Sequence, residues 1–243
     1  MKYKKLGILG GMGPLATYNL YKNIIDATPA KKDQDHIDMV ILNASYIPDR
    51  TAGILDGGES PLPYLSDGCK ILENAGCDII AIPCNTSHYF YDELQENCRV
   101  KILNMIDLVA ERLEEQGMSS VFLMATAGTV KAGIYKKYLS KRNIDILPSD
   151  EDEIELIMKA IYDIKAGIAI DLSDIITVVK KYYALGCKKI ILGCTELSLI
   201  KDDMINMDSS LDDLFIDSTD VLKDKIIKLF GVCNQKQLRF TAK

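Results

Sequence analysis

The chain has 243 residues, of which 48% are hydrophobic and 26% are charged, enough for one large domain or two small ones with ample core. The formal net charge of -6, without a basic stripe, argues against a nucleic-acid partner. No apolar run approaches the roughly 20 residues that span a bilayer, and the first one breaks at Gly10-Gly11, too early for a signal peptide. We therefore expect no membrane segment and a cytoplasmic location.

In the first half of the chain, short apolar runs alternate with segments of helical period. The pattern predicts strands over residues 6–9, 37–42 and 78–82, and helices over 14–26 and 66–74. Pro14 is well suited to the first turn of its helix, where a missing N–H costs nothing.

The same order restarts in the second half. We expect strands over residues 121–124, 144–147 and 189–192, and helices over 106–116, from about 134, over 151–167 and over 172–185. A final helix is predicted over 217–231 and should pack back on the first half. This alternation predicts an α/β fold with parallel sheets covered by helices on both faces.

The two halves resemble rough copies of each other. Each begins with a strand that runs into a turn of small residues, and each holds a later strand that ends at a cysteine. We expect two similar Rossmann-like lobes related by a pseudo-twofold axis, one formed by residues 1–105 plus 210–243 and the other by 106–209. Because ligands collect beyond the carboxyl ends of parallel strands, the site should lie in the cleft between the lobes.

Cys84 and Cys194 occupy matching positions, each after an apolar run and before a probable helix. Two thiols that face one carbon from opposite sides can invert a stereocentre by acid–base chemistry, and helix N-termini favour the thiolate that such a base requires. The odd count of seven cysteines and the absence of a Cys-x-x-Cys pair disfavour a disulfide framework and a zinc site. The remaining cysteines are expected to be small buried hydrophobes: Cys69, Cys77, Cys98, Cys187 and Cys233.

Three other features leave alternatives open. His88 follows Cys84 by four residues, so a Cys–His hydrolase is conceivable, as is a supporting role for His88 beside the thiol. The Gly11-x-Gly13-x-x-Ala16 turn matches the loose dinucleotide fingerprint, which alone is a weak signal. Arg50 lies in a predicted loop, where an arginine fork could bind a carboxylate or simply be solvated.

Taken together, these segments resemble the aspartate/glutamate racemase family of cofactor-independent amino-acid racemases. The matching segments span nearly the whole chain in the family's order: Gly10-Gly11-Met12-Gly13-Pro14 with Ala16-Thr17, Pro48-Asp49-Arg50-Thr51, Pro83-Cys84-Asn85-Thr86-Ser87-His88, Ala125-Thr126-Ala127-Gly128-Thr129 and Gly193-Cys194-Thr195-Glu196-Leu197.

The resemblance implies a two-base racemase in which Cys84 and Cys194 are the acid–base residues. It implies that Arg50 holds the side-chain carboxylate of an aspartate-type substrate and that Lys165 supplies a second cation. It further implies a small acidic amino acid as substrate, no cofactor such as pyridoxal phosphate, no metal, and commonly a homodimer. The residues that should border the substrate's α-carboxylate and ammonium are Met12, Asn85, Thr86, Thr126 and Thr195.

Four functional classes thus remain in competition. A Cys84–His88 hydrolase or lyase would tolerate the loss of Cys194, and a non-enzymatic amino-acid-binding protein would need neither thiol. A dinucleotide oxidoreductase would carry a detectable cofactor. The racemase needs both thiols, and the sequence does not decide between aspartate and glutamate.

Overall fold

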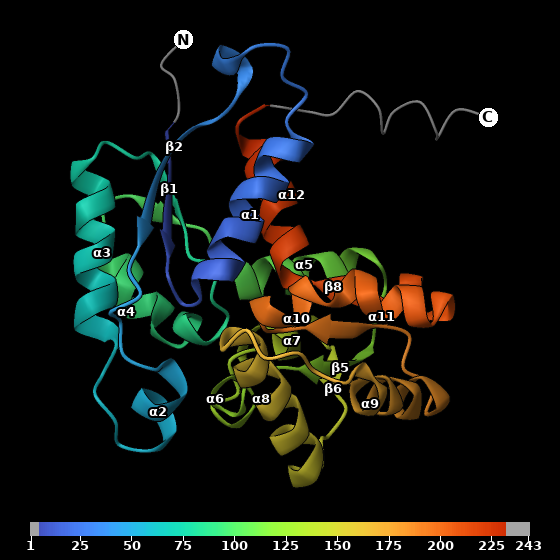
Figure 1. The fold of residues 1–243 in the computed structure, drawn as a ribbon. Helices are drawn as coiled ribbons and strands as arrows, with labels where there is room; N and C mark the ends of the chain where they lie inside the picture. Colours follow the sequence, from blue (N-terminus) through green and yellow to red (C-terminus); the bar gives the residue numbers. More distant parts are fainter. Residues whose placement is uncertain (1–4, 232–243) are drawn as a thin grey trace.

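The computed structural model describes residues 5–231, and these form two four-stranded parallel sheets. The first sheet has the order β2-β1-β3-β4 and the second has the order β6-β5-β7-β8, so the same arrangement occurs twice (Figure 1). The strands are β1 (Lys5–Gly10), β2 (Asp38–Asn43), β3 (Ile79–Ala81), β4 (Lys101–Ile102), β5 (Ser120–Met124), β6 (Asp145–Ile146), β7 (Ile190–Leu192) and β8 (Phe215–Asp217).

Helices cover both faces of each sheet, as the alternating pattern predicted. They are α1 (Pro14–Ala27), α2 (Arg50–Leu55), α3 (Leu62–Asn74), α4 (Tyr91–Glu96), α5 (Met105–Glu115), α6 (Ala127–Lys131), α7 (Lys136–Leu139), α8 (Glu151–Lys165), α9 (Leu172–Ala184), α10 (Thr195–Leu199), α11 (Lys201–Met207) and α12 (Ser218–Leu229). Short 3-10 turns complete the set at η1 (Asp33–Asp35), η2 (Thr86–Phe90), η3 (Ser140–Arg142) and η4 (Ser209–Leu214). None of the helices in this range is long and apolar enough to cross a lipid bilayer. The predicted α/β fold with two similar lobes is confirmed.

The core consists of apolar layers on either side of each sheet. In the first lobe, α3 and α4 pack on one face through residues such as Leu72 and Leu94, while α1 and α12 pack on the other. Leu222 and Ile226 of α12 lie in the same buried cluster as Leu6 of β1, so the final helix packs on the first lobe as expected (Figure 1).

The chain returns to the first lobe later in the sequence than the predicted boundary. Strand β8 pairs in parallel with β7, so residues 215–217 belong to the second sheet and not to the first lobe, which was assigned from residue 210. Only after β8 does the chain return to the first lobe, as α12. The rest of the predicted division stays a prediction, and its last residues, 232–243, lie outside the described residues.

Several short elements were missed or misread from the pattern. β4 and β8 are two and three residues long, too short for a period to be recognised. The helix expected from about residue 134 is only the four-residue α7, followed by the 3-10 turn η3, and the short helix α6 before it was not predicted. Arg50 does not lie in a loop: it is the first residue of α2, whose N-cap is Asp49.

The cysteines outside the matched pair behave as expected where the structure describes them. Cys69, Cys77, Cys98 and Cys187 are free and buried. Cys233 lies outside the described residues.

The lobes meet closely where α6 passes α2. A Cβ atom added at Gly128 of α6 would lie 2.8 Å from Thr51 Oγ1 and 3.0 Å from Thr51 Cα, which is backbone that cannot rotate away. We therefore expect Gly128→Ala to destabilise the fold by about 1–3 kcal/mol through overpacking. Urea denaturation should show a lower midpoint with an unchanged slope, and an unchanged midpoint would contradict so close an approach.

Candidate active site

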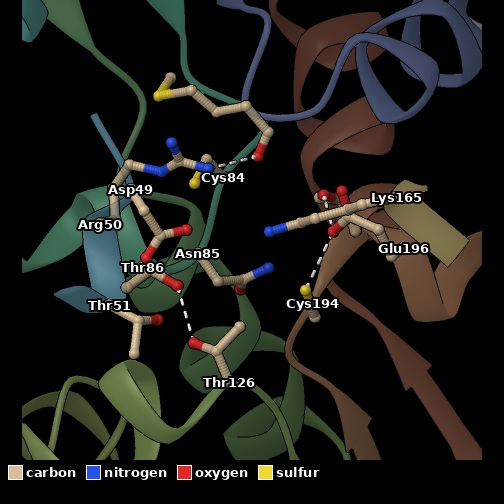
Figure 2. Close-up of a pocket in the computed structure, with 12 residues that line it drawn as sticks. Asp49, Arg50, Thr51, Cys84, Asn85, Thr86, Thr126, Lys165, Cys194 and Glu196 are labelled. Carbon is tan, nitrogen blue, oxygen red and sulfur yellow. Dashed lines mark hydrogen bonds between the residues drawn. The ribbon is translucent and has the colours of Figure 1, made fainter. Parts of the chain in front are cut away.

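A cavity lies between the two lobes at the carboxyl ends of their strands (Figure 2). Every residue predicted for the site lines it, and they come from segments far apart in the sequence. The lining residues are Met12, Asp49, Arg50, Thr51, Cys84, Asn85, Thr86, Thr126, Lys165, Cys194, Thr195 and Glu196. The structure thus brings the two cysteines, one from each lobe, to a single site.

The glycine turn after β1 shapes one wall of this cavity. Gly11 has a φ of 89°, and a Cβ atom there would lie 2.5 Å from the backbone nitrogen of Ala44. Only glycine fits such a conformation at such a distance. At Gly13 an added Cβ would lie 3.1 Å from Glu196 Oε1, so the turn faces the second lobe directly.

Arg50 is a buried cation whose Nε is left without a hydrogen-bond partner in the described part of the chain. Its Nη1 donates to the carbonyl oxygens of Ile47 (3.3 Å) and Pro48 (3.0 Å), and its Nη2 donates to Met12 O (3.3 Å). Among the described residues its Nε has no hydrogen-bond partner, although the side chain is only 8% exposed. A buried donor of this kind calls for an acceptor, and a bound carboxylate would supply one.

Cys84 lies against this guanidinium (Figure 2). Burial alone would lower the pKa of Arg50, but the charges of Cys84 and Asp49 outweigh it and raise that pKa. Arg50 therefore stays cationic, and it offers a positive charge to the Cys84 sulfur.

Cys194 has the opposite environment. Its Sγ donates to Glu196 Oε2 at 3.0 Å, and Thr195 Oγ1 donates to the same oxygen at 3.3 Å. Burial and the charge of Glu196 raise the pKa of the Cys194 thiol well above its ordinary value, although Lys165 works in the other direction. Cys194 therefore retains its proton through neutral pH and shares it in a hydrogen bond to the Glu196 side chain.

We expect Glu196→Gln to lower the pKa of Cys194, because the substitution removes the negative charge that disfavours the thiolate. In a Cys84→Ser background, the rate of Cys194 alkylation followed by mass spectrometry should begin to rise at a lower pH. Glu153→Gln, at a carboxylate outside the cavity, serves as the control. An alkylation profile that does not move would show that burial alone sets this pKa.

Lys165 is the second cation. The residue as a whole is exposed, but its ammonium group reaches into the cavity and lies 4.8 Å from the centre of the Tyr162 ring. Burial of the ammonium lowers its pKa, yet the charges of Cys194, Glu196 and Cys84 raise it, so the pKa ends above its ordinary value. Lys165 thus brings a full positive charge to the side of the cavity formed by the second lobe.

Asp49 connects the lobes beside these cations. Its Oδ1 caps α2 by accepting from Ala52 N–H at 2.9 Å, and its Oδ2 accepts from the Tyr162 hydroxyl at 2.9 Å. Burial would raise the pKa of Asp49, but these hydrogen bonds and the charge of Arg50 lower it. The cavity therefore contains an ionised carboxylate together with the two cations.

Hydroxyl groups from both lobes meet at the floor of the cavity. Thr86 Oγ1 lies 2.9 Å from Thr126 Oγ1 and 2.9 Å from Thr129 Oγ1, and the last two lie 3.0 Å apart (Figure 2 shows the Thr86–Thr126 bond). Because each hydroxyl can rotate, this triangle can turn one proton toward an anion in the cavity.

His88 is not placed to serve Cys84 as a base. Met105 N–H donates to its Nε2 at 3.1 Å, so Nδ1 carries the proton and donates to the Cys84 carbonyl at 2.9 Å. Burial lowers the pKa of His88, which keeps the ring neutral. Both ring nitrogens are used by backbone groups, which removes the base that a Cys84–His88 hydrolase requires.

Sequence reasoning named no role for Asp49, Thr51 and Glu196. All three stand inside motifs that were recognised, within two residues of Arg50 or Cys194.

The helical segments that follow the two cysteines are short. After Cys84 the chain forms the 3-10 turn η2 of five residues, and after Cys194 it forms α10, also of five residues. Side-chain charges, more than helix dipoles, therefore set the environment of each thiol. In the described part of the chain, no group of three or more His, Cys, Asp or Glu side chains could hold a metal ion.

Comparison with known proteins places this chain in one class. The profile of the family described as Asp/Glu/Hydantoin racemase matches residues 9–225, so the chain belongs to that family.

Individual relatives agree with this assignment. The structure of an aspartate racemase from Picrophilus torridus is 33% identical, with 94% of each chain covered and a TM-score of 0.79. An aspartate racemase homologue from Pyrococcus horikoshii OT3 is 27% identical with a TM-score of 0.74, over 94% of this chain and 99% of that one. A broad specificity amino-acid racemase from Bacillus subtilis is 30% identical over 151 residues, which are 60% of this chain and 64% of that relative.

Proposed function

We propose that the protein is a cofactor-independent racemase that interconverts L- and D-aspartate by means of Cys84 and Cys194. The observation that carries this proposal is the meeting of two thiols, one from each lobe, in one cavity with two cations. The likeness to an aspartate racemase over 94% of both chains supports aspartate as the substrate. A homodimer and a cytoplasmic location stay predictions.

The charges of the cavity fit a dicarboxylic amino acid. The unused Nε of Arg50 and the ammonium of Lys165 would bind the side-chain carboxylate. The hydroxyls of Thr86, Thr126 and Thr195, with Asn85 and Met12, would border the α-carboxylate and the ammonium, and Asp49 offers that ammonium an anionic acceptor.

In the proposed reaction, Cys84 as thiolate removes the Cα proton, and the Cys194 thiol donates its proton to the opposite face of the same carbon. The product then leaves Cys84 protonated and Cys194 as thiolate, and the reverse reaction uses the two groups in exchanged roles. The assignment of Cys194 as the resting donor follows from its raised pKa. In this proposal the cationic Arg50, which lies beside Cys84, is the counter-charge for the Cys84 thiolate.

Charge that develops on the α-carboxylate as the proton leaves must be stabilised, because an α-proton is very weakly acidic. Donors fixed in a water-poor cavity do this well, since they need not reorganise during the reaction. Thr86, Thr126 and Asn85 are all buried and would act in this way.

Proton NMR in D2O tests the proposal. The purified protein is incubated with L-aspartate, then with L-glutamate, without any added cofactor. Loss of the α-proton signal together with the appearance of the D-enantiomer on chiral chromatography is the expected result with aspartate. Binding of aspartate without α-proton exchange would favour an amino-acid-binding protein, and no binding or exchange with either acid would overturn the assignment of substrate.

A further inference from the structure

A buried tyrosine that does not line the cavity forms a hydrogen bond to a residue that does. Tyr135 follows α6 in the second lobe and is 0% exposed. Its hydroxyl donates to Asn85 Oδ1 at 2.7 Å, across the boundary between the lobes. Burial raises the pKa of Tyr135, so its hydroxyl stays protonated and remains a donor at any working pH.

The directions of the hydrogen bonds around Asn85 are fixed by the last acceptor. Leu192 O can only accept, so the Ser218 hydroxyl donates to it at 2.8 Å. Ser218 Oγ therefore accepts from Asn85 Nδ2 at 3.1 Å, which leaves Oδ1 facing Tyr135. Among the described residues, no group takes the second N–H of Asn85, and this side chain lines the cavity between the two thiols (Figure 2).

The hydrogen bonds from Asn85 through Ser218 to Leu192 form a relay, and its two ends lie next to the two cysteines. Asn85 directly follows Cys84, and Leu192 precedes Cys194 by two residues on β7. The hydrogen bonds from Asn85 through Ser218 to Leu192 thus connect the segment that carries one thiol to the segment that carries the other. A chain of buried hydrogen bonds of this kind holds its members in one geometry.

We propose that Tyr135 and Ser218 are positioning residues that fix the Asn85 amide and the placement of Cys84 relative to Cys194. This role rests on the proposed two-thiol function. Tyr135 holds the amide oxygen and Ser218 holds the amide nitrogen, so the free N–H points to the site of charge development. Without Tyr135, Asn85 Oδ1 loses its buried donor and the amide is held at one end only.

The test is a comparison of Tyr135→Phe with the wild-type protein, in D2O with L-aspartate. We expect kcat to fall roughly tenfold to a hundredfold, the effect of one lost buried hydrogen bond, with a smaller change in KM. The ratio of deuterium incorporation with retention to inversion should rise, because a misplaced opposite thiol gives the first thiol time to exchange its new proton for deuterium from D2O and return it to the same face. A merely structural defect lowers the amount of active protein and leaves this ratio unchanged.

Tyr182→Phe is the matched control. Tyr182 is 2% exposed and donates to Pro148 O at 2.6 Å, but it does not line the cavity, so kcat and the ratio should stay near wild type. Ser218→Ala removes the group that holds the Asn85 amide nitrogen and should raise the same ratio. This second variant keeps the test usable if Tyr135→Phe does not fold. Wild-type values of kcat and ratio in both variants would overturn the positioning role, whereas an inactive wild-type protein would overturn the proposed function and this role with it.

Discussion

Replacement of either Cys84 or Cys194 by serine is expected to abolish racemisation and to leave the fold nearly intact. Both thiols are buried, at 5% and 6% exposure, and serine fits the same space. A hydroxyl is a far weaker acid than a thiol, so serine neither ionises to form a base nor readily donates its proton to Cα. Since a positioned acid or base contributes about 10²–10⁴-fold, we expect a loss of at least about a thousandfold in kcat.

The two variants differ in what they retain. Cys194→Ser keeps Cys84 beside Arg50, so it should still exchange the α-proton of the enantiomer whose Cα–H faces Cys84, without inversion. Cys84→Ser should exchange only the opposite enantiomer, and only at a pH high enough to ionise Cys194, whose pKa is raised. NMR in D2O with L- and D-aspartate separately measures both rates, and Cys187→Ser, at a buried cysteine away from the cavity, should behave as wild type. Full racemisation by either site variant would refute the two-base mechanism.

Arg50→Lys should cost on the order of a hundredfold in kcat/KM, although the charge is conserved. The guanidinium donates to the carbonyls of Ile47, Pro48 and Met12, and its buried Nε has no partner among the described residues. A lysine ammonium has three donors on a flexible stem and cannot reproduce this fork. Both the wall of the cavity and the proposed carboxylate contact should therefore be lost.

Steady-state kinetics with aspartate measures this effect, with most of it expected in KM because the side-chain carboxylate is bound in the ground state as well. Arg112→Lys is the control, since Arg112 pairs with Asp224 on the surface and does not line the cavity. An unchanged kcat/KM in Arg50→Lys would show that Arg50 does not bind the substrate.

The part of the site that lies at the ends of strands could be predicted from the sequence. Cys84 and Cys194 each follow a buried apolar run, and parallel strands deliver their carboxyl ends to one edge of a sheet. The repeated order of elements in the two halves then placed both thiols toward a common cleft. Motif resemblance added Arg50 and Lys165, whose positions in the cavity no local pattern would have indicated.

The surroundings of each thiol required the folded chain. Rotamers and contacts between the lobes have no sequence period. They decide that Glu196 lies beside Cys194 Sγ, that Arg50 Nε has no partner among the described residues, and that Tyr135 donates to Asn85. The same holds for β8, three residues that carry the chain through the second sheet before α12 returns to the first lobe.

By itself, the sequence determined the α/β class, the repeated lobes and the cysteine pair, because hydrophobic period and strand-end position are local properties of the chain. Only the tertiary structure decided which charge each thiol faces, because that depends on the rotamers of Glu196 and Arg50 in the folded chain. It also decided how the lobes are joined, because packing brings together side chains more than a hundred residues apart, such as Asn85 and Ser218.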